Sequence, residues 1–84
     1  MILIISAAAL KALAKMPKQG RDALRSKLEI FAAAPFADHG WAKRLIGSKA
    51  VRIRQGDWRA ICDVDGNALV VIVVKVGHRR EVYE

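Results

Sequence analysis

The fold is decided by residues 51–64, VRIRQGDWRAICDV, in which apolar and basic side chains alternate on both sides of a glycine. A period of two is typical of a β-strand that buries one face. Gly56 suits the first central position of a two-residue type II′ turn, because that position requires a positive φ. We therefore expect a β-hairpin in which Gln55 pairs with Trp58.

This turn sets the register of the hairpin, and residues directly opposite one another share a face of the sheet. Arg54 would then lie opposite Arg59. The apolar face, which we expect to pack on helices, would consist of Val51, Ile53, Trp58, Ala60 and Cys62. The other face would gather Arg52, Arg54 and Arg59. Two opposed arginines repel each other by up to about 1 kcal/mol, so the pair favours a phosphate bound over this face; the alternative is a solvated basic surface.

The N-terminal half predicts a strand followed by two helices. Residues 2–5 form an apolar run suited to a strand, and Ser6 can cap a helix over residues 7–16. Pro17 and Gly20 are expected to break that helix. A second helix is expected over about residues 19–34, because Pro35 would end it. Two amphipathic helices with a short break between them predict a helical hairpin.

The rest of the chain predicts one irregular segment and one more strand. Residues 36–48 show no period; Trp41 there is expected to cover the core, and His39 has no assigned role. Asp65-Gly66 or Gly66-Asn67 would form a second hairpin turn. Residues 68–74 are continuously apolar, as expected for a strand covered on both faces, and residues 76–77 would end it.

The predicted order is β-α-α-β-β-β in a single domain over residues 1–84. This is an α+β fold, with a helical hairpin packed on a small, mainly antiparallel twisted sheet.

Composition restricts the function. Fifteen Lys and Arg stand against eight Asp and Glu, and the net charge of +7 indicates a polyanionic partner. The single cysteine, Cys62, permits no internal disulfide and lies in an apolar run typical of a core. The two histidines are far apart without cysteine partners, so we expect neither a metal nor a cofactor. The apolar start of the chain is too short to span a bilayer, and we expect a cytoplasmic protein with no membrane partner.

The tail VGHRREVY, residues 76–83, carries the most reactive side chains. Four of them would leave the last strand next to the strand of Arg59: His78, Arg79, Arg80 and Tyr83. The second turn leaves open whether they reach the arginine face. If they do, the site suits RNA cleavage by attack of the 2′-OH. Histidine can act as acid or base near neutrality, arginine can stabilise the phosphorane, and tyrosine can move a proton or stack on a base.

Residues 51–84 resemble the C-terminal half of the RelE/ParE superfamily of bacterial type II toxins, and the RelE branch in particular. The matching motifs are VRIR at residues 51–54, GDWR at 56–59, an apolar strand at 69–74, and VGHR at 76–79 followed by Tyr83. The resemblance implies a ribosome-dependent endoribonuclease that cuts mRNA in the ribosomal A site without a metal and so inhibits translation. It also implies a cognate antitoxin, RelB-like or another DNA-binding protein, through which alone the pair would contact operator DNA.

The resemblance further implies roles for individual residues. Arg52 and Arg54 match basic strand residues that contact or activate the scissile phosphate. Arg59 and Arg79 match arginines that stabilise the transition state. Tyr83 matches a C-terminal tyrosine implicated in stacking or proton transfer.

The chain departs from the best-known RelE proteins at two positions of the basic strand. Lysines, one of them proposed as a base, occupy the positions of Arg52 and Arg54 there. Arginine stays protonated and cannot be the base, so His78 becomes the better candidate for general base or acid, and whether His78 or Tyr83 transfers the proton stays open. Further basic residues are expected either to contact RNA or to form a solvated surface. They are Lys11, Lys15, Lys18, Arg21, Arg25, Lys49 and Arg80.

Two other functions remain open at this point. A ParE-like toxin would share the fold, bind DNA gyrase and cut no RNA. A basic RNA-binding module without activity would explain the charge, but it gives no reason for a histidine and a tyrosine beside the arginines.

Overall fold

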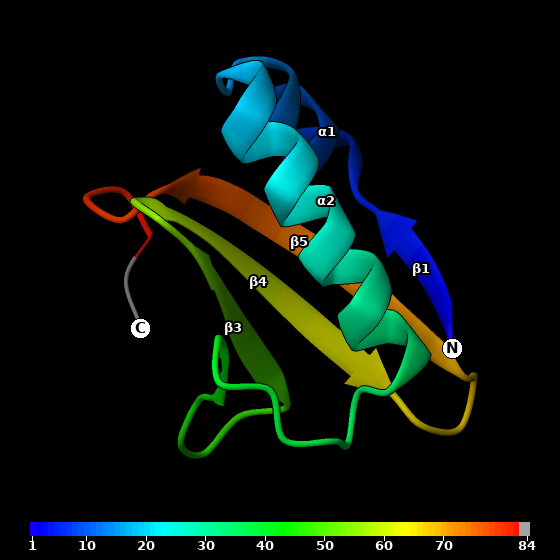
Figure 1. The fold of residues 1–84 in the computed structure, drawn as a ribbon. Coiled ribbons are helices and arrows are strands. Elements are labelled where there is room, and N and C mark those ends of the chain that lie inside the picture. The colour runs from blue at the N-terminus through cyan, green and yellow to red at the C-terminus, as the bar shows by residue number, and fades with distance from the viewer. Residues whose placement is uncertain (83–84) are drawn as a thin grey trace.

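The computed structural model describes residues 1–82, which form five strands and two helices. In chain order these elements are β1 Ile2–Ile5, α1 Ala7–Ala14, α2 Lys18–Ala33, β2 Ala42–Arg44, β3 Ala50–Gln55, β4 Trp58–Asp65 and β5 Val70–His78. The strands form one twisted sheet in the order β1-β5-β4-β3-β2. Only the β1–β5 pairing within these residues is parallel. Both helices lie on one face of the sheet (Figure 1). The α+β prediction is therefore confirmed.

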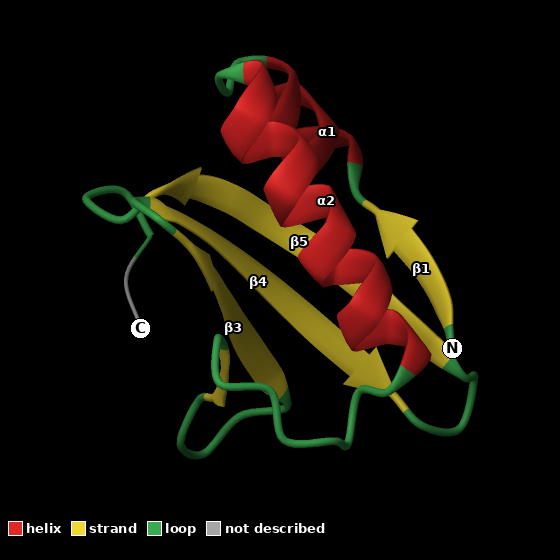
Figure 2. Cartoon of the chain, in the orientation of Figure 1, coloured by secondary structure: helices red, strands yellow, loops and turns green. Residues whose placement is uncertain are grey.

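The predicted element order lacked one strand, β2. It is three residues long, and its residues Ala42 and Lys43 pair with Ile53 and Arg52 of β3. Figure 2 shows it as a short strand between long loops. A strand this short cannot display an alternating pattern, which is why the irregular segment hid it.

The helices begin and end close to the predicted positions. The Ser6 hydroxyl accepts a hydrogen bond from the Ala9 N–H at 3.1 Å, which confirms the predicted cap of α1. Pro17 separates the two helices as expected. Gly20, however, lies inside α2 and does not break it. A Cβ added there would lie 3.9 Å from the Trp58 ring, an ordinary contact distance, so the packing around α2 does not require glycine at this position.

The first hairpin has the predicted register. Gln55 pairs with Trp58, and Arg54 pairs with Arg59. Gly56 has a φ of +57°, and Asp57 is not among the residues with positive φ, as the type II′ assignment requires.

The second hairpin turn differs from the prediction of a two-residue turn. Asp65 pairs with Val70, so four residues connect β4 to β5. The Asp65 carboxylate accepts hydrogen bonds from the N–H groups of Asn67 and Ala68 at 3.0 and 3.1 Å, and Leu69 takes a φ of 58°. The side chain of Asp65 therefore stabilises a longer turn. Strand β5 begins at Val70 and continues to His78, past the predicted end at residues 76–77.

The core lies between the helices and one face of the sheet. Leu13, Leu24, Leu28 and Phe31 of the helices pack against buried sheet residues that include Val51, Ile53, Ala60, Cys62, Val71 and Val73. The opposite face, which we call the open face, carries no helix. On it Val70 and Ile72 are only half buried, so the prediction that this strand is covered on both faces was wrong.

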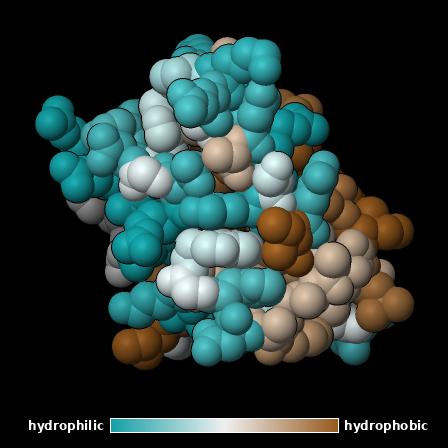
Figure 3. All heavy atoms as spheres, viewed as in Figure 1, coloured by the Kyte–Doolittle hydropathy of each residue, from teal (hydrophilic) through white to brown (hydrophobic). Residues whose placement is uncertain are grey.

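Several large apolar residues are exposed. Ile46 is fully exposed in the loop before β3, and on the edge strand β1 Ile2 is 65% exposed and Ile4 is 46% exposed. Figure 3 shows apolar residues towards β1 and hydrophilic residues towards the opposite side. Neither helix in the described residues is long and apolar enough to cross a membrane.

Cys62 is expected to be chemically inert in the folded protein. It is fully buried, and that burial, with a smaller contribution from the charge of Asp63, raises the pKa of its thiol to about 12. Because the thiolate is the reactive form, a disulfide reagent at pH 8 should label the native protein more slowly than the denatured protein, by on the order of 10²-fold or more. Equal labelling rates would show that the thiol is accessible and would reopen a nucleophilic role.

Candidate phosphate-binding site

Two rows of side chains cross the open face near the first hairpin turn. In the first row Lys43, Arg52, Ile61 and Lys75 are successive cross-strand partners. In the second row Arg54 pairs with Arg59, and Arg59 pairs with Gly77. Directly paired residues share a face, so the hairpin places its three arginines together as predicted.

Arg79 joins these arginines from the tail. Its N–H donates to the Asp57 carbonyl at 2.7 Å, and its Nε lies 3.6 Å from an Asp57 carboxylate oxygen. Partial burial, followed by the positive charges of Arg52, Arg54 and Arg79, lowers the pKa of the Arg59 guanidinium. Since those three charges act on Arg59, the four guanidinium groups form one site. We call Arg52, Arg54, Arg59 and Arg79 the arginine cluster.

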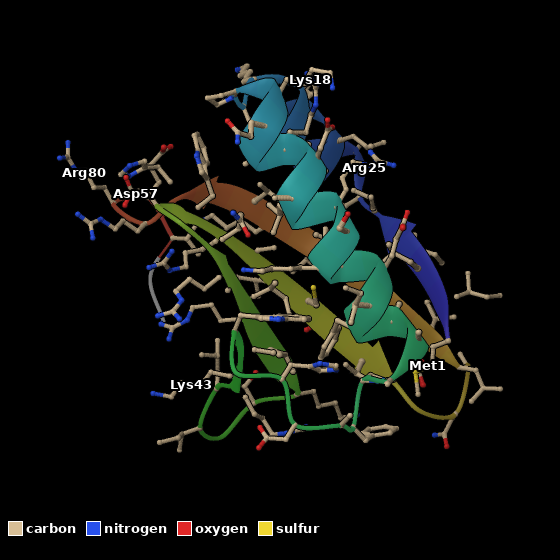
Figure 4. The ribbon with its side chains drawn as sticks, in the orientation of Figure 1. Met1, Lys18, Arg25, Lys43, Asp57 and Arg80 are labelled. Carbon is tan, nitrogen blue, oxygen red and sulfur yellow. The ribbon has the colours of Figure 1, made fainter. Side chains whose placement is uncertain are left out.

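The Arg59 side chain is held in place by the turn beside it. Its Nη1 donates to the carbonyl oxygens of Gly56 and Trp58 at 2.8 and 2.9 Å. Two bonds on one nitrogen fix the plane of the guanidinium. A guanidinium has five N–H donors, so after these two bonds Arg59 keeps other N–H groups that can bind an anion. In Figure 4 the labelled Lys43, Asp57 and Arg80 lie on the side of the molecule away from Met1, along the border of this site.

His78 does not lie on the open face. It pairs with Trp58, whose side chain faces the helices, and the two rings meet edge to face with centroids 5.6 Å apart. Its Nδ1 accepts a hydrogen bond from the Arg80 N–H at 3.2 Å. The tail turn therefore engages Nδ1 as a hydrogen-bond acceptor. The sequence left open whether the tail residues reach the arginine face, and the structure places His78 on the other face.

A β-bulge is the physical reason for this difference. Ile61 pairs with Lys75 but Cys62 pairs with Val73, so Val74 is an extra residue in β5. Simple alternation from the buried Val73 would place His78 on the open face. The bulge reverses the alternation beyond it, which turns His78 towards the helices and Lys75 towards the arginine cluster.

After β5 the tail folds back across the end of the sheet. The N–H groups of Glu81 and Val82 donate to the His78 carbonyl at 2.8 and 3.2 Å. Val82 is buried, and its Cγ2 would lie 2.9 Å from a Cβ added to Gly77, so Gly77 is required by close approach. Gly77 pairs with Arg59, and the tail therefore returns to the open face beside the arginine cluster. Tyr83, which follows Val82, lies outside the described residues.

The other predicted RNA-binding residues are not part of this site. Lys11 and Lys15 lie in and just after α1, and Lys18, Arg21 and Arg25 lie on α2, on the helical side of the molecule. Asp22 partly neutralises that group, with a carboxylate oxygen 2.8 Å from the Lys18 Nζ. Lys49 is exposed in the loop before β3, at the strand end opposite to the hairpin turn, and Arg80 is exposed in the tail turn.

Three lysines near this site were not predicted: two lie on the open face, and a third bonds strand β3 from helix α2. Lys43 and Lys75 depend on β2 and on the bulge. Lys27 of α2 donates from Nζ to the Arg54 carbonyl at 2.9 Å, and that Nζ lies 5.7 Å from the centre of the Trp41 ring. Burial first, and then the charge of Arg54, lowers the pKa of Lys27. The helical spacing of Lys27 offered a hint, because it lies three residues after Leu24 and four before Phe31, at the border of the core stripe. Within residues 1–82 no group of three His, Cys, Asp or Glu side chains could hold a metal ion.

Comparisons with known proteins agree with this fold. Residues 3–83 match the family model of the ParE toxin of the parDE type II toxin–antitoxin system. No curated protein sequence matches the chain.

Similar solved structures are RelE–RelB complexes. The chain is 24% identical in sequence to one chain of an archaeal RelE–RelB complex from Pyrococcus horikoshii. The TM-score is 0.81, and the match covers 96% of this chain and 97% of the other. For the intact RelBE complex of E. coli the identity is 25% and the TM-score 0.78, over 92% of this chain and 94% of the other. For RelBE2 of Mycobacterium tuberculosis the identity is 20% and the TM-score 0.75, over 93% and 96%.

Proposed function

The chain belongs to the ParE toxin family of type II toxin–antitoxin systems, within the RelE/ParE superfamily, and on this premise we propose that it cleaves messenger RNA on the ribosome. The observation that carries the proposal is the arginine cluster on an uncovered sheet face. Four guanidinium groups next to one another repel unless an anion lies among them. Phosphate matches the planar fork of arginine, and RNA presents a phosphate at each cleavable bond.

In the proposed reaction the 2′-oxygen attacks the adjacent phosphorus and the 5′-oxygen leaves. The 2′-OH gives up its proton, the 5′-oxygen gains one, and the products are a 2′,3′-cyclic phosphate and a 5′-OH. The arginine cluster stabilises the negative charge of the phosphorane, which is greatest in the transition state. Arg59 is the best-placed member, because its turn contacts fix it before the substrate arrives.

Proton transfer is assigned to Tyr83 rather than to His78. The Nδ1 of His78 is engaged by the tail turn, and its ring lies on the other face of the sheet. Tyr83 follows Val82, which packs on Gly77 beside Arg59. Basic residues on the helical side, from Lys11 to Arg25, are proposed to contact ribosomal RNA.

A cognate antitoxin is the proposed protein partner, as RelB is in the similar RelE complexes. The open face has two halves: a basic half at the arginine cluster, and a second half where Ile2 pairs with Val70 and Ile4 with Ile72. Asp65 and Asp63 lie beside these apolar residues, as the β4 partners of Val70 and Ile72. A segment with an apolar stripe beside an acidic one would complement both halves. Operator DNA would be bound by the antitoxin and not by this chain.

Expression without the antitoxin should arrest growth, and translated messages should acquire discrete cuts that primer extension maps. The same RNA without ribosomes should remain intact, because binding on the ribosome is proposed to orient the substrate for the reaction. Cuts in ribosome-free RNA would contradict the ribosome requirement, and an intact translated message in arrested cells would contradict the nuclease assignment.

A ParE-like toxin that inhibits DNA gyrase is the second candidate. Two observations favour it: the matching family model is that of ParE, and His78 lies away from the arginine cluster. Inhibition of purified gyrase together with intact messages would establish this function. Binding to ribosomal RNA without cuts, arrest or gyrase inhibition would instead support a non-catalytic RNA-binding module.

A further inference from the structure

A recess of about 200 Å³ lies next to the arginine cluster, at the border between β2 and β3. Its walls are Gly40, Trp41, Ala42, Lys43, Arg52 and Arg54. Arg52 and Arg54 therefore belong both to this recess and to the arginine cluster. An anion bound by those two arginines would have the recess immediately beside it.

Trp41, one of the residues that line the recess, is held rigidly before any ligand binds. The Trp41 ring is stacked on His39 at 4.7 Å between centroids, and His39 meets Phe31 edge to face at 6.0 Å. The His39 Nε2 lies 2.8 Å from the Ala34 carbonyl oxygen, which ties this stack to the end of α2. The Trp41 carbonyl accepts from the Arg54 N–H at 2.9 Å, so the backbone of Trp41 is fixed relative to that of Arg54. A fixed wall lowers the entropy lost when a flat ligand is bound.

The lining groups select for a planar ligand that accepts hydrogen bonds. Arginine guanidinium planes stack on nucleobases, and lysine and arginine donate to acceptor atoms on base edges. Lys43 pairs with Arg52, so an ammonium group lies at the rim of the recess. None of the six lining residues carries a negative charge. The recess therefore suits a ligand whose phosphate is bound by the neighbouring arginine cluster.

We infer that this recess is a base pocket: it holds the nucleobase of single-stranded RNA that adjoins the phosphate bound by the arginine cluster. The inference rests on the proposed function, because it takes the bound phosphate to be that of RNA. It gives Trp41, which sequence reasoning placed only over the core, a second role as the wall of a specificity site. The base in this pocket would bias which messages are cut.

Nuclear magnetic resonance titration of the whole chain tests the inference without relying on cleavage. The ligands are the four nucleoside 3′,5′-bisphosphates, compared with inorganic phosphate at equal ionic strength. The bisphosphates should shift the Trp41 indole signal and the Gly40 and Lys43 amides, whereas phosphate should shift only signals of the arginine cluster. The Trp58 indole is an internal control, because it faces the helices.

The outcomes separate the two ideas. If both ligands shift the arginine signals but no base shifts Trp41, the base pocket is overturned and the proposed phosphate site survives. If neither ligand shifts any of these signals, the phosphate site fails and the inference fails with it.

A matched pair of variants adds a second measurement. Lys43 and Arg44 are neighbours in β2 and point to opposite faces of the sheet. Lys43→Ala should weaken bisphosphate binding by about fivefold, as expected for one charge-assisted hydrogen bond at an exposed site, while Arg44→Ala should change it less than about twofold. Equal losses in the two variants would mean that net charge alone attracts the nucleotide, and would overturn the pocket.

Discussion

Replacing Arg59 by alanine should slow single-turnover cleavage of ribosome-bound mRNA by about 10²- to 10³-fold, the range for loss of one preorganised donor to a transition-state anion. Arg59 is the centre of the arginine cluster: Arg54 lies directly opposite it, and Arg52, Arg54 and Arg79 all act on its charge. Its removal takes away a guanidinium whose plane is fixed by two backbone carbonyls. Binding of the ribosome should change far less than the cleavage rate.

Two further variants make this result specific. Arg59→Lys keeps the charge but loses the fork that matches phosphate, so we expect it to recover only part of the rate. Arg44→Ala removes one positive charge from the opposite face of the same sheet and should cleave within about twofold of the unmodified protein. Because Arg59 also bonds the turn, the melting temperature of each variant must be measured. A folded Arg59→Ala variant that cleaves at the normal rate would refute the assigned site.

The arginine cluster could largely be predicted from the sequence because the first hairpin is self-contained. Gly56 fixes the turn, alternation fixes the faces, and together they determine which residue lies opposite Arg54. No distant contact is needed to reach that result. The α+β class, the core stripe of α2 and the Ser6 cap follow in the same way from local patterns.

The faces of the tail residues could not be predicted, because they depend on one extra residue in a uniformly apolar run. Nothing in residues 70–74, VVIVV, distinguishes Val74 as the bulge. If the side chains alternate from Val73 with Val74 included, Lys75 and His78 fall on one pair of faces. If Val74 is treated as the extra residue of a bulge, each of them falls on the opposite face. The base pocket was hidden for a related reason: it requires β2, whose three residues show no period. The closeness of His78 to Arg79 in the sequence therefore did not show on which face of the sheet the imidazole lies.

His78→Ala should slow cleavage by about 10²-fold, although His78 is proposed to transfer no proton; misplacement of catalytic groups by about 1 Å can cost this much. The imidazole accepts the Arg80 N–H and so holds the turn that carries Arg79 to the cluster and Val82 onto Gly77. Without that acceptor the tail turn loses the hydrogen bond from the Arg80 N–H. His78 is therefore proposed as a positioning residue that acts through Arg79 and the end of the tail.

Asparagine and glutamine at position 78 distinguish positioning from acid–base catalysis. The amide oxygen of Asn can occupy the place of Nδ1 and accept the Arg80 N–H, so His78→Asn should cleave within about threefold of the unmodified protein. The amide of Gln reaches instead towards the place of Nε2, so His78→Gln should resemble His78→Ala. The dependence of the rate on pH should keep the same shape in the unmodified protein and in His78→Asn, since no titrating proton donor or acceptor has been lost. If Asn proves as slow as Ala and one limb of the pH profile disappears with it, the imidazole is the acid or base, and the tail must turn over on the ribosome to bring His78 to the open face.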